Sequence, residues 1–438
     1  MKTEETTVNS SPTIPASSVV LARFFYGWVV VGCAFTVLCV AYGIQFTFGV
    51  FMPAISQETG WDRASLSLPY SLYIFLYSAL GVVTGRLTDR WGPRIVITVG
   101  GCLLSLGILL TSQVQTLWQM YLFFGLIAAS GMSAAYVPCN STVVRWFVER
   151  RGLALSLTSS GASFGNFLFP PLAATLIHAY GWRNSYIILG VLALLTISLC
   201  ATFIARDPET LGLQPDGRLA EEPLPTAASA VAPFSSTDWT LATAQCTPAF
   251  WLLTVIFTLT WLVVFMPLVH VVPFAVDLGI SPVRAAFGIS AIGLGGFAGR
   301  LVIGAISDRC GRLPTLGLCL SLQAVAFLCF PISKGEMTLY STAAVFGLSY
   351  GGITALFPAL IGDFFGRAAV GSIVGFIFAV AGSPAAFGPL IAGYIYTASH
   401  SYTVAFLLSA ALNTLALILL FFLKKPHQFA HKNKTSFS

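Results

Sequence analysis

The sequence predicts an all-α integral membrane protein, with twelve transmembrane helices arranged as two parallel six-helix repeats. Composition is the first reason: of 438 residues, 56% are hydrophobic and 9% are charged. Soluble globular proteins carry about a quarter charged residues. So few charges cannot cover the surface of a soluble protein of this size, which excludes a soluble enzyme, a nucleic-acid-binding protein and a fibrous protein. The placement of Lys and Arg and an internal repeat are the other two reasons.

Twelve apolar segments are bounded by charges, Gly/Pro turns and interfacial aromatic residues. A helix that spans the bilayer needs about 20 mostly apolar residues, which each segment approaches or exceeds. The segments lie at 26–51, 66–87, 95–114, 118–140, 152–176, 185–205, 249–276, 285–307, 315–332, 338–361, 369–396 and 402–423.

The longest polar stretch divides the twelve segments into two sets of six. It covers residues 206–248, is rich in Ala, Pro and Ser, and is expected to be a flexible cytoplasmic linker without a packed core. The predicted order is a cytoplasmic tail (1–25), an N-terminal six-helix bundle (26–205), the linker, a C-terminal six-helix bundle (249–423) and a second cytoplasmic tail (424–438).

The basic residues predict the orientation. If the N-terminus is cytoplasmic, inner segments hold 17 of the 22 Lys and Arg residues, outer loops hold 4, and Arg300 alone lies inside a span. This excess follows the positive-inside rule. Both termini are therefore predicted to be cytoplasmic, in a multi-pass protein of the plasma or inner cell membrane.

A short motif occurs once in each half. The segment Gly85-Arg-Leu-Thr-Asp89-Arg90-Trp-Gly92 recurs as Gly304-Ala-Ile-Ser-Asp308-Arg309-Cys-Gly311, 219 residues later. Both copies are expected in cytoplasmic loops, between helices 2 and 3 and between helices 8 and 9. The carboxylates can accept hydrogen bonds from Arg or a helix N-terminus. We expect Gly85, Asp89, Arg90, Gly304, Asp308 and Arg309 to form gating contacts; the alternative is that these charges only set topology.

The repeated motif resembles the signature of the major facilitator superfamily, and the resemblance covers essentially the whole chain. Further segments resemble its monocarboxylate porter and oxalate/formate antiporter branch, in its bacterial form: Tyr26-Gly-Trp28, Tyr136-Val-Pro138, Arg145-Trp146-Phe147, Gly299-Arg300 and Ser383-Pro384. The resemblance implies the major facilitator fold. It also implies secondary active transport of small monocarboxylate anions by alternating access, with a monomer as the functional unit.

Arg300 is the principal candidate for substrate binding. A charge inside a span is costly and usually functional. All 16 Asp and Glu residues fall in loops, tails or span ends, so a substrate carboxylate is the expected partner, through a bidentate contact. Snorkelling of the side chain to the headgroups is the alternative. In the resembled branch the arginine of helix 8 anchors the substrate carboxylate, and Arg300 occupies that position.

Three positions depart from the branch. Ala381 stands where some members carry lysine or glutamate in helix 11. Phe46 and Gly296 stand where animal lactate carriers have a lysine and an aspartate. The missing second cation argues against a dicarboxylate, and the missing lysine and aspartate remove the usual proton-coupling pair.

His270 is the candidate for proton coupling, because it is the only histidine well inside a span and histidine titrates near physiological pH. Two alternatives stay open: a purely hydrogen-bonding histidine near the outer vestibule, and a substrate that enters with its own proton.

Five further polar residues in apolar spans are candidates for lining the substrate cavity: Gln45, Tyr136, Asn140, Asn166 and Tyr350. They fall on helices that line the cavity in the superfamily. Each could instead bridge two helices by a hydrogen bond.

Three other functions are alternatives to the transport of a monocarboxylate: a drug or metabolite exporter, an organic-anion exchanger and an enzyme. A drug or metabolite exporter often needs an acidic residue in helix 1 or 4, and neither helix has an internal carboxylate; an organic-anion exchanger is a third possibility. An enzyme is not expected, since Walker A and HExxH sequences are missing. No cofactor, metal or nucleic acid is predicted. The expected partners are a small carboxylate, protons if transport is coupled, and the lipid bilayer.

Overall fold

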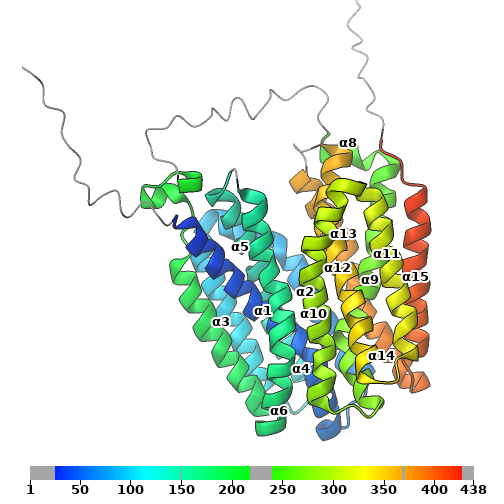
Figure 1. Ribbon diagram of the computed structural model, residues 1–438. Coiled ribbons are helices and arrows are strands. Elements are labelled where there is room, and N and C mark those ends of the chain that lie inside the picture. The colour runs from blue at the N-terminus through cyan, green and yellow to red at the C-terminus, as the bar shows by residue number, and fades with distance from the viewer. Residues whose placement is uncertain (1–24, 149, 218–238, 367–369, 427–438) are drawn as a thin grey trace, which may run out of the picture.

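The computed structural model describes residues 25–148, 150–217, 239–366 and 370–426. These residues form long helices that run between the two ends of one bundle, and they contain no strand (Figure 1). This confirms the predicted all-helical fold class.

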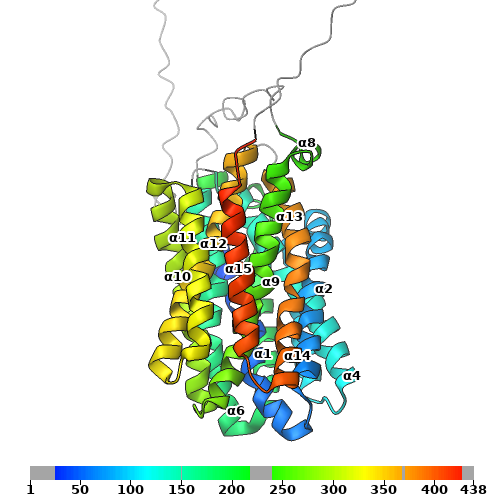
Figure 2. The same cartoon turned by 90° about the vertical axis from the view of Figure 1, so that its right-hand side faces the viewer.

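Five long segments make up the N-terminal half. They are α1 (Gly27–Thr59), α2 (Arg63–Trp91), α3 (Pro93–Thr111), a continuous run of α4 (Leu117–Met120), the π-helix η3 (Tyr121–Ala128) and α5 (Ala129–Trp146), and α6 (Arg151–Phe203). The C-terminal half contains α9 (Pro248–Asp277), α10 (Pro282–Cys310), α11 (Arg312–Cys329), α12 (Glu336–Phe365), α13 (Val370–Ala385), α14 (Phe387–Ser399) and α15 (Thr403–Phe421). Figure 2 shows α9, α14 and α15 side by side.

Eleven helical stretches in the described residues are long and apolar enough to cross a membrane. One of them, α6, has 53 residues, or about 80 Å at 1.5 Å per residue, far more than the hydrocarbon core of a bilayer. Gly181 interrupts it with a backbone φ of 77°. The chain therefore turns at Gly181 and crosses twice, which gives twelve crossings. A loop was predicted between residues 176 and 185, but in the structure Gly181 is the only non-helical residue there.

The repeated motif also has a tighter geometry than the predicted loops. Asp89 and Arg90 belong to the last turn of α2, and Gly92 alone separates α2 from α3 with φ of 84°. Gly311 plays the same part between α10 and α11, with φ of 87°. A left-handed backbone conformation of this kind is inexpensive only for glycine.

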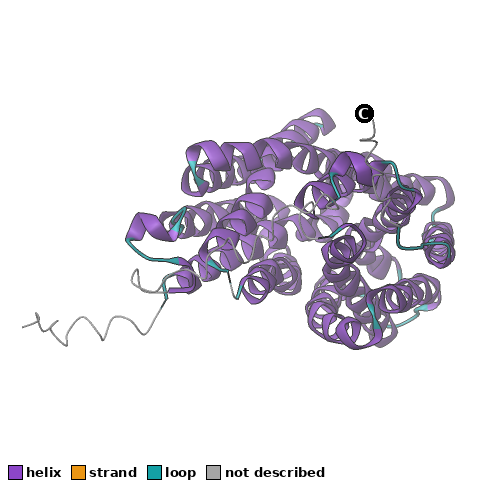
Figure 3. Ribbon diagram, turned by 90° about the horizontal axis from the view of Figure 1, so that it is seen from above, coloured by secondary structure: helices purple, strands orange, loops and turns teal. Residues whose placement is uncertain are grey.

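Small residues let helices approach closely within and between the halves. Gly161 and Gly165 of α6 face the α1 backbone at Phe35 and Cys39, so a side chain there would collide with main-chain atoms. Gly293 of α10 meets the α6 backbone at Phe167 across the two halves in the same way. Such contacts are the usual means of helix association in membranes. Figure 3 shows the helices end-on.

The two halves meet through α1 with α9, α6 with α10, and α2 with α13 and α14. The start of α1 and the end of α15 lie at the end drawn at the top of Figure 1, which we call the inner end because it is predicted to be cytoplasmic. The opposite end is the outer end. In Figure 1 the two halves separate toward the inner end.

The described flanks of the predicted linker are partly helical. They contain η4 (Pro208–Leu211), η5 (Pro215–Gly217) and α8 (Leu241–Gln245), and both Pro208 and Ala244 are buried. The flanks of the linker thus contain short helices with one buried residue each, and a linker without a packed core stays a prediction. Residues 218–238 of the linker and most of the two predicted tails lie outside the described residues.

Candidate functional site

Arg300 lies on α10 and faces the other half of the molecule. Its Nη1 donates a hydrogen bond of 2.7 Å to the backbone oxygen of Ser159 on α6, and the side chain is partly buried. Among the described residues, Arg300 has no carboxylate within ion-pair distance. A guanidinium has five N–H donors, so most of its hydrogen-bonding capacity is available to a ligand.

Glycine residues shape the wall beside Arg300. Gly299 packs against the α12 backbone at Leu348. Gly296 faces Ser163 and Tyr350 at ordinary contact distance. Tyr350, on α12, therefore lies one helical turn away from Arg300 along this wall of α10.

Asn140 joins the same group through Ser159. Its Oδ1 accepts a hydrogen bond of 3.2 Å from the Ser159 hydroxyl, and its Nδ2 donates to the backbone oxygen of Tyr136 at 2.9 Å. Tyr136 is 42% exposed although it lies in the middle of a span, and its ring centroid is 6.3 Å from that of Tyr42. Four of the predicted residues, from both halves, therefore surround one region.

Gln45 and Asn166 are placed differently. Gln45 is 1% exposed on α1, and neither atom of its amide has a hydrogen-bond partner among the described residues. Asn166 is 3% exposed on α6, where its backbone faces Gly293 of α10. Neither residue contacts Arg300 directly.

His270 lies in the outer half of α9, within a chain of hydrogen bonds. Its Nε2 is 2.9 Å from the backbone oxygen of Pro389, and its Nδ1 is 2.9 Å from the Tyr402 hydroxyl. A carbonyl oxygen only accepts, so Nε2 carries the proton and a neutral ring accepts from Tyr402 at Nδ1. The Ser67 hydroxyl on α2, in the other half, lies 3.4 Å from Nε2. His270 is fully buried.

An ion pair between the two halves adjoins this chain. Arg63, at the start of α2, forms a bidentate pair with Asp277 at the end of α9, with N–O distances of 2.6 and 2.7 Å. The same guanidinium donates to the Tyr402 hydroxyl at 2.9 Å. We call Arg63, Ser67, His270, Asp277, Pro389 and Tyr402 the outer network.

The outer ends of α2 and α14 are joined as well. The Thr397 hydroxyl donates to Asp62 at 3.3 Å across the two halves. Hydrogen bonds from the Ser65 side chain and backbone hold the pKa of Asp62 below its usual value, so this carboxylate is ionised near neutral pH.

The sequence does not predict the ion pair between Arg63 and Asp277. It indicates only that Arg63 is a charge in an outer loop. The sole signal was that opposite charges stand at the outer ends of two spans. Only the packing of α14 against both α2 and α9 shows that these two charges meet.

At the inner end, the first copy of the repeated motif makes contacts within the N-terminal half. Asp89 accepts a hydrogen bond of 2.7 Å from Arg145, which also bonds to Asp207 at 3.2 Å. Arg90 and Arg309 are exposed, Gly85 and Gly304 lie within their helices, and the Asp308 side chain lies outside the described residues.

Among the ion pairs of the described residues, only Arg63–Asp277 joins the two halves. The gating role of the motif stays a prediction.

The described residues make twelve apolar crossings in two halves, which are joined mainly toward one end, as is typical of a membrane transport protein. The sequence model of the Major Facilitator Superfamily matches residues 34–302 and 251–437. The chain belongs to this superfamily, whose members are transporters and not enzymes.

Similar proteins include monocarboxylate transporters. The chain is 28% identical to Monocarboxylate transporter 13 of Rattus norvegicus, over 88% of this chain and 86% of that protein. It is 28% identical to Monocarboxylate transporter 11 of Homo sapiens, over 88% and 80% of the two chains. The uncharacterized MFS-type transporter YhjX of Escherichia coli is also 28% identical, over 74% of this chain and 78% of that protein.

A solved structure supports the fold. The bacterial homolog of the human lysosomal transporter Spinster, in an inward-facing and occupied conformation, superposes with a TM-score of 0.68. The two chains are 14% identical, and the match covers 94% of this chain and 97% of the other.

Proposed function

We propose that this protein is a secondary carrier of small monocarboxylate anions that works by alternating access, with Arg300 as the anchor of the substrate carboxylate. The observation that carries the proposal is the position of Arg300: a partly buried cation in a span, bonded to one neutral backbone oxygen. A carboxylate can occupy the remaining donors in a bidentate contact. The relatives named as monocarboxylate transporters agree with it.

The contacts between the halves support alternating access. The cross-half ion pair lies at the outer end, and the described inner ends have no counterpart to it. Arg300 and the partly exposed Tyr136 stand on the inner side of the outer network. A substrate would then reach Arg300 from the inner side in this conformation, and from the outer side after the outer network has opened.

Proton coupling is a separate part of the proposal. His270 belongs to the outer network and does not contact Arg300. Coupling through His270 would therefore act on the opening of the outer end and not on the bound carboxylate.

Uptake of labelled monocarboxylates into proteoliposomes tests the anchor. We expect Arg300→Ala to lower kcat/KM roughly 100-fold for every transported monocarboxylate, because losing one side of a charged, hydrogen-bonded contact costs about 3 kcal/mol. Arg284→Ala is the control: Arg284 is an exposed arginine whose partner, Glu336, lies in the same half. Unchanged affinity and uptake in Arg300→Ala would show that the anchor is elsewhere.

A further inference from the structure

Helices α6 and α10, which belong to opposite halves, meet along a regular series of contacts. The Ser290 hydroxyl donates a hydrogen bond of 2.7 Å to the backbone oxygen of Phe167. One turn further along α10, Gly293 also meets the α6 backbone at Phe167. The same face of α10 continues toward the inner end, and two turns later it brings Arg300 opposite Ser159.

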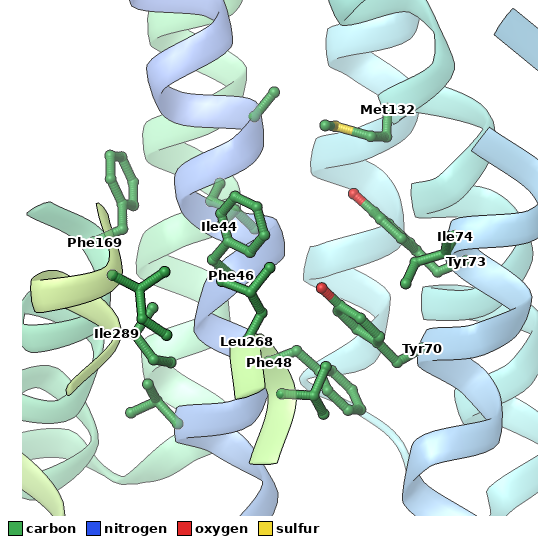
Figure 4. Close-up of a cluster of buried hydrophobic side chains, with 14 of the residues drawn as sticks. Ile44, Phe46, Phe48, Tyr70, Tyr73, Ile74, Met132, Phe169, Leu268 and Ile289 are labelled. Carbon is green, nitrogen blue, oxygen red and sulfur yellow. The ribbon is translucent and has the colours of Figure 1, made fainter. Parts of the chain in front are cut away.

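Toward the outer end, this contact between the helices continues into apolar packing. Phe169 of α6 and Ile289 of α10 belong to one buried cluster with Leu268 of α9 (Figure 4). All three side chains are at most 3% exposed. Close packing of this kind fixes the register of two helices. The whole interface therefore determines where the backbone oxygen of Ser159 lies relative to Arg300.

The hydrogen bond to Ser159 uses one side of the Arg300 guanidinium. Nη1 donates to the Ser159 backbone oxygen, which can also accept a bond within α6 because a carbonyl oxygen has two lone pairs. The edge formed by Nε and Nη2 keeps two parallel N–H donors that have no protein partner among the described residues. A carboxylate binds best to such a parallel pair. The Ser159 carbonyl thus determines which edge of Arg300 is available to a substrate.

Asn140 on α5 holds Ser159 in turn. Its Nδ2 donates to the backbone oxygen of Tyr136 at 2.9 Å, and this fixes the orientation of the amide, since a carbonyl oxygen only accepts. Its Oδ1 is therefore the atom that accepts from the Ser159 hydroxyl, at 3.2 Å. These contacts form a chain from α5 through α6 to Arg300 on α10, and the last step crosses between the halves.

We propose that Asn140 and Ser159 are positioning residues for the substrate carboxylate. Asn140 holds Ser159, and the Ser159 carbonyl turns the Nε/Nη2 edge of Arg300 toward the substrate. Asn140 then acts through Arg300 and does not itself contact the substrate. This inference rests on the proposed function, in which Arg300 binds the carboxylate, and it gives Asn140 a role other than lining the cavity.

Uptake of labelled acetate, butanoate and pentanoate into proteoliposomes tests the positioning role, since these probes share a carboxylate and differ only in their apolar chains. We expect Asn140→Ala and Ser159→Ala each to raise KM about fivefold, by the same factor for every probe, because each loses one hydrogen bond. The value of kcat should stay as in the wild type. The double variant should resemble either single variant, since both substitutions break the same contact. Ser159→Thr keeps the hydroxyl and should retain the wild-type KM.

Ser290→Ala is the matched control. It removes a serine hydroxyl that also forms a hydrogen bond between α6 and α10, but this hydroxyl bonds to Phe167 and not to Ser159 or Arg300. The KM for each probe should therefore stay as in the wild type. An equal rise of KM in Ser290→Ala would show that any loosening of this helix pair has the same effect, and would overturn the specific role of Asn140 and Ser159.

The remaining outcomes separate the positioning role from the carrier function. If uptake requires Arg300 but KM is unchanged in Asn140→Ala and Ser159→Ala, the positioning role is wrong and the carrier function stands. Changes of KM that differ between probes would overturn it as well, since Asn140 would then contact the substrate directly. A lower kcat at unchanged KM would show a purely structural role. If Asn140→Ala does not fold, Ser159→Ala carries the same test.

Two results would contradict the proposed function instead. One is a wild-type protein that takes up none of the three probes, and the other is uptake that does not require Arg300.

Discussion

At the scale of single residues, two arginines on spanning helices have opposite surroundings. Arg63 meets Asp277 in a bidentate pair and also bonds to Tyr402. Arg300 meets one backbone oxygen. A paired arginine joins two structural elements, whereas one that lacks a counter-ion is suited to hold an anion that comes and goes. The sequence singles out Arg300 because it lies within a span, but it gives no reason to connect Arg63 with Asp277.

His270 can influence the outer network through its protonation state. In the neutral ring, Nδ1 accepts from Tyr402, whose oxygen also accepts from Arg63. Protonation would turn Nδ1 into a donor and place a second cation near Arg63. Both changes work against the closed outer end.

We therefore expect an inward proton gradient to drive accumulation of substrate in proteoliposomes, to about tenfold for a gradient of about one pH unit. His270→Gln keeps a hydrogen-bonding side chain that does not titrate. It should lose this accumulation but retain exchange of internal for external substrate. His178→Gln, at an exposed position near the outer end, is the control. Normal accumulation by His270→Gln would mean that this histidine only stabilises the closed network, and no accumulation by the wild type would exclude proton symport.

At the scale of elements, the structure places α2 against α14 at the outer end, and this contact has to open during transport. Asp62 and Thr397 are hydrogen-bonded there, at 3.3 Å. Close approach is possible because Gly393 of α14 faces Ser67 of α2, where a larger side chain would collide. Alternating access requires these two helix ends to separate.

A disulfide between these ends should stop transport. In a variant without the nine native cysteines, Asp62→Cys combined with Thr397→Cys should form a cross-link on oxidation and lose nearly all uptake. Reduction should restore uptake to the level of the two single-cysteine variants. A cross-linked protein that still transports would show that the outer ends of α2 and α14 do not need to part.

Several helix boundaries were predicted well, and the misses have one cause. Patterns of hydropathy locate α3 and α15 to within a few residues, because charges and turn residues bound them. They locate the turns at Gly181, Gly92 and Gly311 but predict loops there that are too long, because a single glycine reverses the chain and helical residues continue on both sides of it. The span predicted for 369–396 likewise comprises two helices, α13 and α14, with Ala386 between them.

At the scale of the whole molecule, orientation in the membrane remains a prediction from the distribution of basic residues. Gln57 lies exposed at the outer end of α1, and Lys425 lies exposed at the inner end after α15. A chemical label at each position therefore reports which side of the membrane that end of the bundle faces.

Single cysteines at these positions, in the cysteine-free protein, should differ in their labelling. A membrane-impermeant thiol reagent added to intact cells should label Gln57→Cys and should label Lys425→Cys only after permeabilisation. The physical reason is the retention of Lys and Arg on the cytoplasmic side. The reverse pattern would place both predicted cytoplasmic tails outside.

The amino-acid sequence alone predicts the membrane-spanning helical fold, the duplicated architecture and the exceptional position of Arg300. These follow from composition, periodicity and the cost of a charge in lipid, which depend on the chain alone. Helix packing determines which side chains meet: Arg63 with Asp277, and His270 with Tyr402. Those contacts join residues far apart along the chain, so they depend on how the helices pack and rotate against one another, which hydropathy does not encode.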